Sequence, residues 1–226
     1  MNKKDLVDAV IVAAGQSTRF GGDKLFADLC GYPVIVRTID AIAKAPSIQQ
    51  IIIVGAAEEL EKLETLCKKS QSKKPKIFVE GGNRRRDSVE AGIGLTRTEY
   101  VAIHDGARPL VETSLIETCI EEARGRMGAL LASPINDSIK RISGKNVIEN
   151  LEREELRAAQ TPQVVRKIDW IKSAKINTSD VSDDIAMLDK LDGEIRVIEG
   201  DLENIKITRP IDLILARTIW EQRASS

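Results

Sequence analysis

Short runs of apolar residues alternate along the chain with longer segments in which apolar residues recur every three or four positions. The short runs are typical of strands buried on both faces of a sheet, and the longer segments are typical of amphipathic helices. Strands are predicted at residues 8–14, 51–54, 76–80, 100–104, 128–132, 194–199 and 204–208, and helices at 34–44, 58–69, 87–95, 114–126, 182–191 and 210–220. This alternation predicts an α/β, Rossmann-like fold, in which a mostly parallel sheet has helices on both faces and binds ligands beyond the carboxyl ends of its strands.

Residues 138–152 interrupt the alternation, because two polar, strand-like segments flank the sequence Ser143-Gly-Lys-Asn146. A glycine-containing turn between such segments predicts a β-hairpin. An isolated hairpin is only marginally stable, so we expect it either to grip a second copy of the chain or to form a solvent-exposed flap. The spacing favours neither alternative. We predict one domain over residues 1–226, with this β-arm inserted at about residues 134–156.

Composition and charge limit the classes of function. The 226 residues carry a net charge of −1, so no nucleic-acid partner is expected and any anion site must be local. His104 is the only histidine, which argues against a Ser-His-Asp hydrolase and against a histidine metal site. Cys30, Cys67 and Cys119 lack zinc-ligand spacing and suit reduced thiols. With no signal peptide and no membrane-spanning run, the sequence predicts a cytoplasmic protein.

The first predicted strand leads into a loop of small residues followed by two cations. Ala13-Ala14-Gly15 lets the backbone approach a ligand closely, and successive N–H groups in such a loop can hold a phosphate. Arg19 and Lys24 follow and can reach the same phosphate. The loop matches neither the P-loop nor the dinucleotide-binding pattern. An ordinary solvated loop is the alternative interpretation.

Three further segments lie at expected strand ends. Gly81-Gly82 precedes Arg84-Arg85-Arg86 and a helix that starts near Ser88, which suits an anion or a base edge, although an arginine run is more often a solvated patch. In His104-Asp105-Gly106-Ala107-Arg108-Pro109, Asp105 can hold a divalent cation and Arg108 can pair with a phosphate. A capped turn is the alternative there, and His104 is predicted to pack within its strand. Lys206 can point to the site or to solvent.

These residue types suit nucleotidyl transfer. A phosphate monoester is already anionic near neutral pH, so it can attack the α-phosphorus of a nucleotide without a general base. The protein then has to align the attacking and leaving groups and neutralise charge in the transition state. Arginines, lysines and Mg²⁺ supply that charge, and the sequence is rich in the first two and nearly free of histidine.

Taken in order, the segments resemble the 2-C-methyl-D-erythritol 4-phosphate cytidylyltransferase family of the non-mevalonate isoprenoid pathway. The matching motifs are Ala13-Ala14-Gly15 with Arg19 and Lys24, Gly81-Gly82 with Arg85, Asp87 and Ser88, the segment 104–109, Thr161-Pro162-Gln163, Ser182-Asp183 and the segment 204–210. The resemblance implies that CMP passes from CTP to 2-C-methyl-D-erythritol 4-phosphate, giving 4-diphosphocytidyl-2-C-methyl-D-erythritol and pyrophosphate. It also implies Mg²⁺ as cofactor and a homodimer in which the arm of one subunit completes the neighbour's site.

The resemblance implies roles for individual residues. It implies catalysis by Arg19, Lys24 and Lys206; nucleotide binding by Ala13, Ala14, Gly15, Gly82, Arg85 and Ser88; substrate binding by Asp105, Arg108, Ser138, Arg153, Thr161, Ser182 and Lys206; and metal binding by Asp105. Ser138 and Ser182 stand where the family more often has threonine, so the hydroxyl is kept and a methyl group is lost.

Two alternatives to this reaction are considered. A ribitol-5-phosphate cytidylyltransferase shares the fold and the cations, but such enzymes tend to carry Ala-Gly-Gly where this chain has Ala13-Ala14-Gly15. A non-catalytic nucleotide-binding or dimerisation module would have little use for transition-state cations. The joint presence of Arg19, Lys24, Asp105 and Lys206 argues against it.

Overall fold

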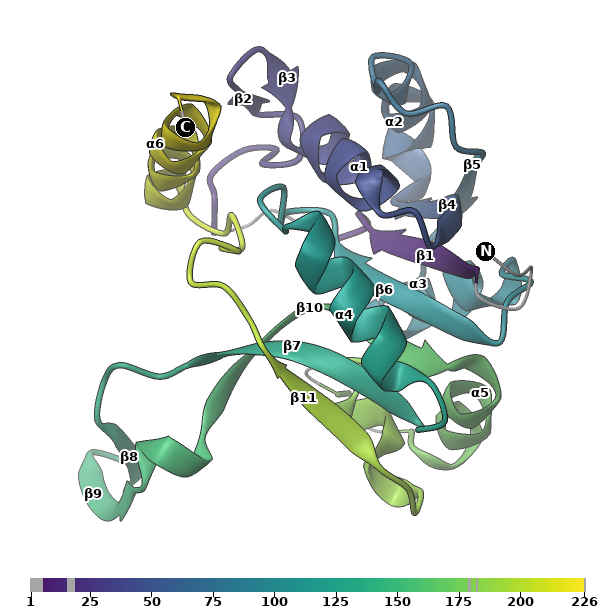
Figure 1. Ribbon diagram of the computed structural model, residues 1–226. Helices are drawn as coiled ribbons and strands as arrows, with labels where there is room; N and C mark the ends of the chain where they lie inside the picture. The colour runs from purple at the N-terminus through teal and green to yellow at the C-terminus, as the bar shows by residue number, and fades with distance from the viewer. Residues whose placement is uncertain (1–5, 16–18, 179, 182, 226) are drawn as a thin grey trace.

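The computed structural model describes residues 6–15, 19–178, 180–181 and 183–225 (Figure 1). The strands are β1 (Val7–Val12), β2 (Asp28–Leu29), β3 (Tyr32–Pro33), β4 (Ile48–Gly55), β5 (Lys76–Glu80), β6 (Tyr100–Asp105), β7 (Gly128–Pro134), β8 (Ile139–Ser143), β9 (Asn146–Leu151), β10 (Arg157–Arg166) and β11 (Ile195–Glu199). The α-helices are α1 (Val34–Lys44), α2 (Leu60–Cys67), α3 (Arg85–Gly94), α4 (Thr113–Ala123), α5 (Lys167–Ile176) and α6 (Pro210–Ser225). The short 3₁₀ helices are η2 (Ala57–Glu59), η3 (Arg153–Glu155) and η4 (Ala186–Lys190).

Seven of these strands form one sheet in the order β11-β7-β10-β6-β1-β4-β5. All neighbouring strands in it run parallel except β10, which is antiparallel to both β6 and β7. The predicted α/β class with a mostly parallel sheet is therefore confirmed. Because β1, β4, β5 and β6 are parallel neighbours, the loops that follow them meet at one edge of the sheet.

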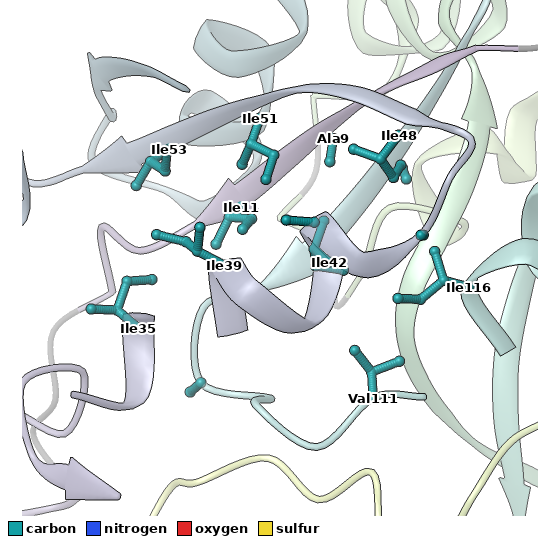
Figure 2. Close-up of a cluster of buried hydrophobic side chains, with 14 of the residues drawn as sticks. Ala9, Ile11, Ile35, Ile39, Ile42, Ile48, Ile51, Ile53, Val111 and Ile116 are labelled. Atoms are coloured by element: carbon teal, nitrogen blue, oxygen red, sulfur yellow. The ribbon is translucent and has the colours of Figure 1, made fainter. Parts of the chain in front are cut away.

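Helices cover both faces of the sheet and form two hydrophobic cores. Alternation along β1 shows the division, since Ala9 and Ile11 belong to one core and Val10 to the other. The first core receives side chains of α1, α2, α4 and α6, and the second receives those of α3, α5 and η4. In Figure 2 the isoleucines of α1, such as Ile39, point toward isoleucines of β1 and β4, such as Ile51. These buried strands fix the positions of the loops at their ends.

The three cysteines are free thiols, as the sequence predicted. Cys67 and Cys119 are buried, and burial raises the pKa of each thiol to about 12. Cys30 is partly exposed in the turn between β2 and β3. The two buried thiols therefore stay protonated and act as small packing residues.

Two predicted elements are wrong. The segment 204–208 pairs with no strand in the described structure, because its polar groups bond to loops instead: Ile207 donates its N–H to the Ala107 carbonyl (2.9 Å). The predicted helix at 182–191 is only the short η4, and Ser182 lies outside the described residues. There the side-chain oxygen of Gln163 accepts the N–H groups of Asp184 and Ile185 (2.9 Å each), which holds these residues in a turn.

The sequence patterns did not predict β10 and α5. A proline argues against a central strand, because it removes a ladder donor, yet β10 contains Pro162. The strand tolerates it because its pairing with β7 is irregular between Ala159 and Gln163. This irregularity lies opposite the end of β6, next to the loops described below.

The predicted hairpin is present as β8 and β9, which pair antiparallel to each other in a separate two-stranded sheet. It protrudes from the body of the molecule at the lower left of Figure 1. On this hairpin the side chains of Ile142, Val147 and Ile148 are 63%, 59% and 59% exposed. The arm therefore carries apolar side chains that no other described part of the chain covers.

Candidate active site

A cleft of about 540 Å³ opens at the carboxyl ends of β1, β5 and β6. Most of the residues assigned to the site from the sequence line it together: Ala13, Ala14, Gly15, Lys24, Gly82, Arg85, Ser88, Asp105 and Lys206. They come from segments up to nearly 200 positions apart in the sequence. The parallel arrangement of the strands brings them to one edge, as the alternation of strands and helices predicted.

Glycine keeps the wall of the cleft open beside the first loop. A Cβ atom on Gly81 would lie 2.8 Å from the Cβ of Ala14 and 2.6 Å from the hydroxyl oxygen of Ser88. A Cβ atom on Gly82 would lie 2.4 Å from that of Asp87. The loop after β5 can therefore approach both the first loop and the start of α3 only because both positions lack a side chain.

Asp105, at the end of β6, carries a carboxylate that three cations surround. Lys206 Nζ lies 2.9 Å from Oδ2, Arg108 Nε 3.4 Å from Oδ2 and Arg85 Nη2 3.5 Å from Oδ1. Burial raises the pKa of Asp105, but Lys206, Arg85 and Arg108 outweigh it and hold that pKa well below its usual range. Asp105 is therefore ionised throughout the neutral range, and the cluster carries an excess of positive charge toward the cleft.

The three consecutive arginines have three different environments. Arg84 is exposed and pairs with Asp87 at the start of α3 (2.7 Å). Arg86 is buried and donates to the backbone carbonyl groups of Asn177 and Ala174. Arg84 and Arg85 both line the cleft, and Arg85 also pairs with Asp105 there. Arg84 is therefore an exposed residue of the cleft lining that pairs with Asp87, Arg86 has a structural role, and Arg85 is the arginine that pairs with the carboxylate of the site.

Arg85 is fixed by a second, more deeply buried carboxylate. Its Nη2 lies 2.7 Å from Oδ2 of Asp184, whose side chain is 2% exposed. Burial lowers the pKa of Arg85, but Asp184 and then Asp105 more than offset this and raise it. In the sequence, Asp183 and Asp184 fit the N-terminus of a predicted helix, so Asp184 was not predicted as a site residue. The pairing joins residues 99 positions apart, and the sequence contains no pattern that indicates it.

His104 packs in its strand, as predicted, and its ring is hydrogen-bonded on both sides. Thr161 Oγ1 lies 3.0 Å from Nδ1, and the Arg108 carbonyl lies 2.9 Å from Nε2. Because a carbonyl only accepts, Nε2 carries the proton and Nδ1 accepts from the threonine. The threonine oxygen in turn accepts the N–H of Asp105 (3.1 Å). This buried chain fixes the backbone at Asp105, and it contains no group that reaches the cleft.

Lys24 and Lys206 both line the cleft but come from distant segments of the chain. Lys24 follows the first loop, and Lys206 precedes α6. Burial lowers the pKa of Lys24, and the positive charge of Lys206 lowers it further, ahead of a smaller effect of exposed Arg19. The cations thus repel one another and Asp105 compensates them only in part. An anionic ligand in the cleft would relieve that repulsion.

Five other predicted residues that the structure describes do not line this cleft: Arg19, Arg108, Ser138, Arg153 and Thr161. Arg108 and Thr161 support Asp105, and the Nη1 of Arg108 donates to the Asn204 carbonyl (2.7 Å). Ser138 and Arg153 are exposed at the base of the arm, where Arg153 donates to the Asn136 carbonyl (2.9 Å). Residues 16–18 of the first loop, including Ser17, and Ser182 lie outside the described residues.

In the part of the chain that the structure describes, the carboxylates around the cleft do not form a metal cage of their own. No group of three or more histidine, cysteine or acidic side chains in the described structure is arranged to hold a metal ion. Mg²⁺ is commonly bound by one or two carboxylates together with substrate phosphates. Asp105 provides one buried carboxylate in the lining of a cation-lined cleft, which fits that mode of binding and not an all-protein metal cage.

A mostly parallel sheet whose strand ends gather small-residue loops, lysines and a buried carboxylate suits a nucleotidyltransferase. Residues 7–222 match the family described as 2-C-methyl-D-erythritol 4-phosphate cytidylyltransferase. The chain belongs to this family.

Individual relatives agree with that assignment. The chain is 40% identical over 226 residues to the 2-C-methyl-D-erythritol 4-phosphate cytidylyltransferase of Dehalococcoides mccartyi strain CBDB1, with 98% of each chain covered. It is 36% identical over 221 residues to the enzyme of that name from Bacillus licheniformis, with 95% of each covered. The crystal structure of 4-diphosphocytidyl-2C-methyl-D-erythritol synthase from Anaerococcus prevotii is similar, with a TM-score of 0.85 at 25% identity, covering 97% of this chain and 100% of that one.

His104 gives the folded protein a defined dependence on pH. Burial lowers its pKa to about 4, against about 6.5 for an exposed histidine, so the folded state favours the neutral ring. This contribution to stability is complete above about pH 6.5 and is lost as the pH falls toward about 4. We expect the free energy of unfolding, measured with urea in EDTA, to be about 2 kcal/mol lower at about pH 5 than at about pH 7.5. His104→Gln should flatten this dependence, and an unchanged slope in the variant would contradict the assignment.

Proposed function

We propose that this cleft is where the chain carries out the reaction of its family, the transfer of CMP from CTP to 2-C-methyl-D-erythritol 4-phosphate. The observation that carries the proposal is the pairing of Lys206 with Asp105 (2.9 Å) in the same cleft that Ala13-Ala14-Gly15 and Lys24 line. It supports an arrangement in which backbone N–H groups meet the nucleotide on one side and cations meet the attacked phosphorus on the other.

The reaction proceeds by in-line displacement. An oxygen of the substrate phosphate attacks the α-phosphorus of CTP, a new P–O bond forms, and pyrophosphate leaves with the electrons of the broken bond. The nucleophile is already an anion, so no proton has to be removed, and His104 is not needed as a base. Lys24, Lys206 and Arg19 stabilise the negative charge that spreads over the phosphate oxygens in the transition state.

The cytidine end of CTP occupies the part of the cleft between the loops that follow β1 and β5. Ala13, Ala14 and Gly15 leave room for the nucleotide, and Gly82 and Ser88 present backbone and hydroxyl groups to it. Arg85 is held by Asp184, so it contributes a fixed positive charge rather than a mobile one. Fixed dipoles and charges lose little free energy to reorganisation when the substrate binds.

Asp105 takes part in two interactions of the proposed site. It positions Lys206 for the attacked phosphorus through their ion pair, and it would serve as the carboxylate ligand of Mg²⁺ beside the sugar-alcohol phosphate. The ion would neutralise triphosphate charge and help pyrophosphate to leave. Asp105 would hold it together with the phosphates of CTP.

A homodimer completes the proposed site. Ser138 and Arg153 lie at the arm, away from the cleft of their own chain, so they contact the sugar-alcohol phosphate in the neighbouring subunit. Arg108, Thr161 and Ser182 belong to the same substrate region of the proposal. The exposed apolar side chains of β8 and β9 supply the surface that a second copy covers.

We place this one-domain enzyme in the cytoplasm, in keeping with its free thiols. Within the described residues, no helix is long and apolar enough to cross a membrane.

The roles of the lysines predict a selective loss of turnover. Lys24→Ala and Lys206→Ala should each lower kcat for pyrophosphate release by about 100-fold or more, because each removes a cation from the transition state. Lys172→Ala, which removes an exposed lysine of α5, is the matched control and should keep full activity. The assay combines CTP, UTP or ATP with methylerythritol phosphate or ribitol 5-phosphate, with and without Mg²⁺.

We expect release only with CTP, methylerythritol phosphate and Mg²⁺ together. Wild-type turnover by either lysine variant would remove its assigned role. Preference for ribitol 5-phosphate would favour the related cytidylyltransferase, and no release with any pair would favour a nucleotide-binding module without catalysis.

If the arm forms the dimer interface, one charged side chain introduced into the arm should dissociate the dimer. Sedimentation equilibrium of the wild type should give about twice the 24.9 kDa of one chain. Val147→Asp should shift the mass toward one chain and lower activity, because it places a carboxylate in the interface. Ile168→Asp, an equally drastic change at an exposed position on α5, should leave the mass unchanged. A wild-type monomer with full activity would contradict the proposed role of the arm.

A further inference from the structure

Arg223, in the last turn of α6, bonds to two separate segments of the chain. Its Nη1 donates to the carbonyl of Leu110 (2.8 Å). On its other edge, Nε lies 2.8 Å from Oε2 of Glu203 and Nη2 lies 2.9 Å from Oδ2 of Asp201. Glu112 lies farther from Nη2, at 3.6 Å. One guanidinium therefore connects residues 110–112 with residues 201–203.

Each of those segments carries one side of the Asp105–Lys206 pair. Leu110 lies five positions after Asp105 in the loop that follows β6, and Glu203 lies three positions before Lys206. The two segments also meet nearer the cleft, where Ile207 donates its N–H to the Ala107 carbonyl (2.9 Å). Arg223 thus links the same two segments that the Asp105–Lys206 ion pair links, at a point farther from the cleft.

The helix that carries Arg223 is itself firmly attached to the protein body. Arg217 Nη2 donates to the Asp28 carbonyl (2.7 Å), and the ring of Trp220 stacks on the guanidinium of Arg37 at 4.1 Å. Arg37 lies in α1, whose apolar face packs in the first core. Arg223 therefore extends from a fixed base. Its planar guanidinium holds several acceptors at set angles, which an ammonium group cannot do.

We propose that Arg223 is a positioning residue for the proposed reaction: by joining the loop of Asp105 to the segment of Lys206, it sets the place of Lys206 at the attacked phosphorus. The inference rests on the proposed function of Lys206. Partly exposed ion pairs contribute little to stability on average, so geometry at the site is the main consequence of these bonds. Small displacements of a catalytic group cost rate even when the displaced residue is remote from the chemistry.

Arg126 provides a matched control at the amino end of the sheet's strands, just before the start of β7. Its exposure is similar (24% against 29%), it lies 3.0 Å from a carboxylate oxygen of Glu194, and it donates to the Glu122 carbonyl (2.9 Å). It resembles Arg223 in bonding, but neither Arg126 nor the residues it bonds to line the cleft in the described structure. Arg223→Ala and Arg126→Ala should therefore lower the melting temperature by similar amounts.

The test compares steady-state kinetics of pyrophosphate release in the full-length variants. Arg223→Ala and Arg223→Lys should each lower kcat by about 10- to 100-fold. The KM for CTP should stay within about twofold, because the nucleotide loops are not displaced. Lys keeps the charge at this position, so its failure to restore activity would assign the effect to the guanidinium geometry. Arg126→Ala should keep wild-type kcat.

Chemical rescue separates positioning from general destabilisation. A groove of about 590 Å³, lined by Leu110, Glu112, Trp220 and Arg223, runs beside these bonds and can admit a free guanidinium ion. Low concentrations of guanidinium chloride should raise the kcat of Arg223→Ala severalfold, whereas sodium chloride at equal ionic strength should not. Where the alanine variant fails to fold, the lysine variant gives the same kinetic comparison.

Wild-type kcat in both Arg223 variants would overturn the inference. A loss of activity would also overturn it if that loss only matched the loss of folded protein and guanidinium did not restore the activity. Lys206→Ala is assayed in parallel. If that variant stays active, the proposed role of Lys206 fails, and the inference with it. If it is inactive while the Arg223 variants are not, only the inference fails.

Discussion

The buried carboxylate of Asp105 and the cations around it fix the arrangement of the site. A carboxylate this deeply buried costs several kcal/mol unless it is paired, and here Arg85, Arg108 and Lys206 pair with it from three separate segments of the chain. The reverse also holds, because those cations would repel one another without a common anion. The carboxylate of Asp105 at the end of β6 therefore helps the folded chain to keep a positively charged cleft. A phosphate that enters this cleft meets charges already in position, which is the condition for electrostatic catalysis.

The rest of the fold maintains that arrangement. Both faces of β6 are covered, and its last peptide is fixed by the bond of Asp105 to Thr161. Thr161 is in turn bonded to the neutral ring of His104, so the single histidine of the sequence serves the site through position and not through proton transfer. On the other side of the carboxylate, Asp184 holds Arg85, and α6 anchors the segment of Lys206. The groups around Asp105 are thus each held by bonds to other parts of the chain, while the arm extends away from them (Figure 1).

Sequence reasoning predicted the parts of this structure that depend on local patterns. The alternation of strands and helices was enough to place Gly15, Gly82 and Asp105 at one sheet edge, because parallel strands end together. It failed where long-range bonds override local preference. Residues 204–208 look like a strand, but their polar groups bond to the loop of Ala107. Asp184 looks like a helix cap, but it pairs with Arg85. The three arginines could not be told apart by their neighbours, since burial against Asn177 or Asp184 is decided by tertiary packing. The step from a nucleotidyltransferase to a particular sugar-alcohol phosphate depended on family resemblance, which the comparisons then established.

The ionisation of Asp105 tests the central claim most directly, because burial and the three cations act on its pKa in opposite directions. Carbon-13 NMR of the Asp105 side-chain carboxyl, assigned with Asp105→Asn, can follow it from about pH 4 to about pH 8, above the usual pKa of about 3.9. We predict that the signal stays at the position of the ionised form throughout this range, and that Lys206→Met moves its titration upward. A wild-type midpoint within the range would show that burial outweighs the cations, and would contradict the account of the site given above.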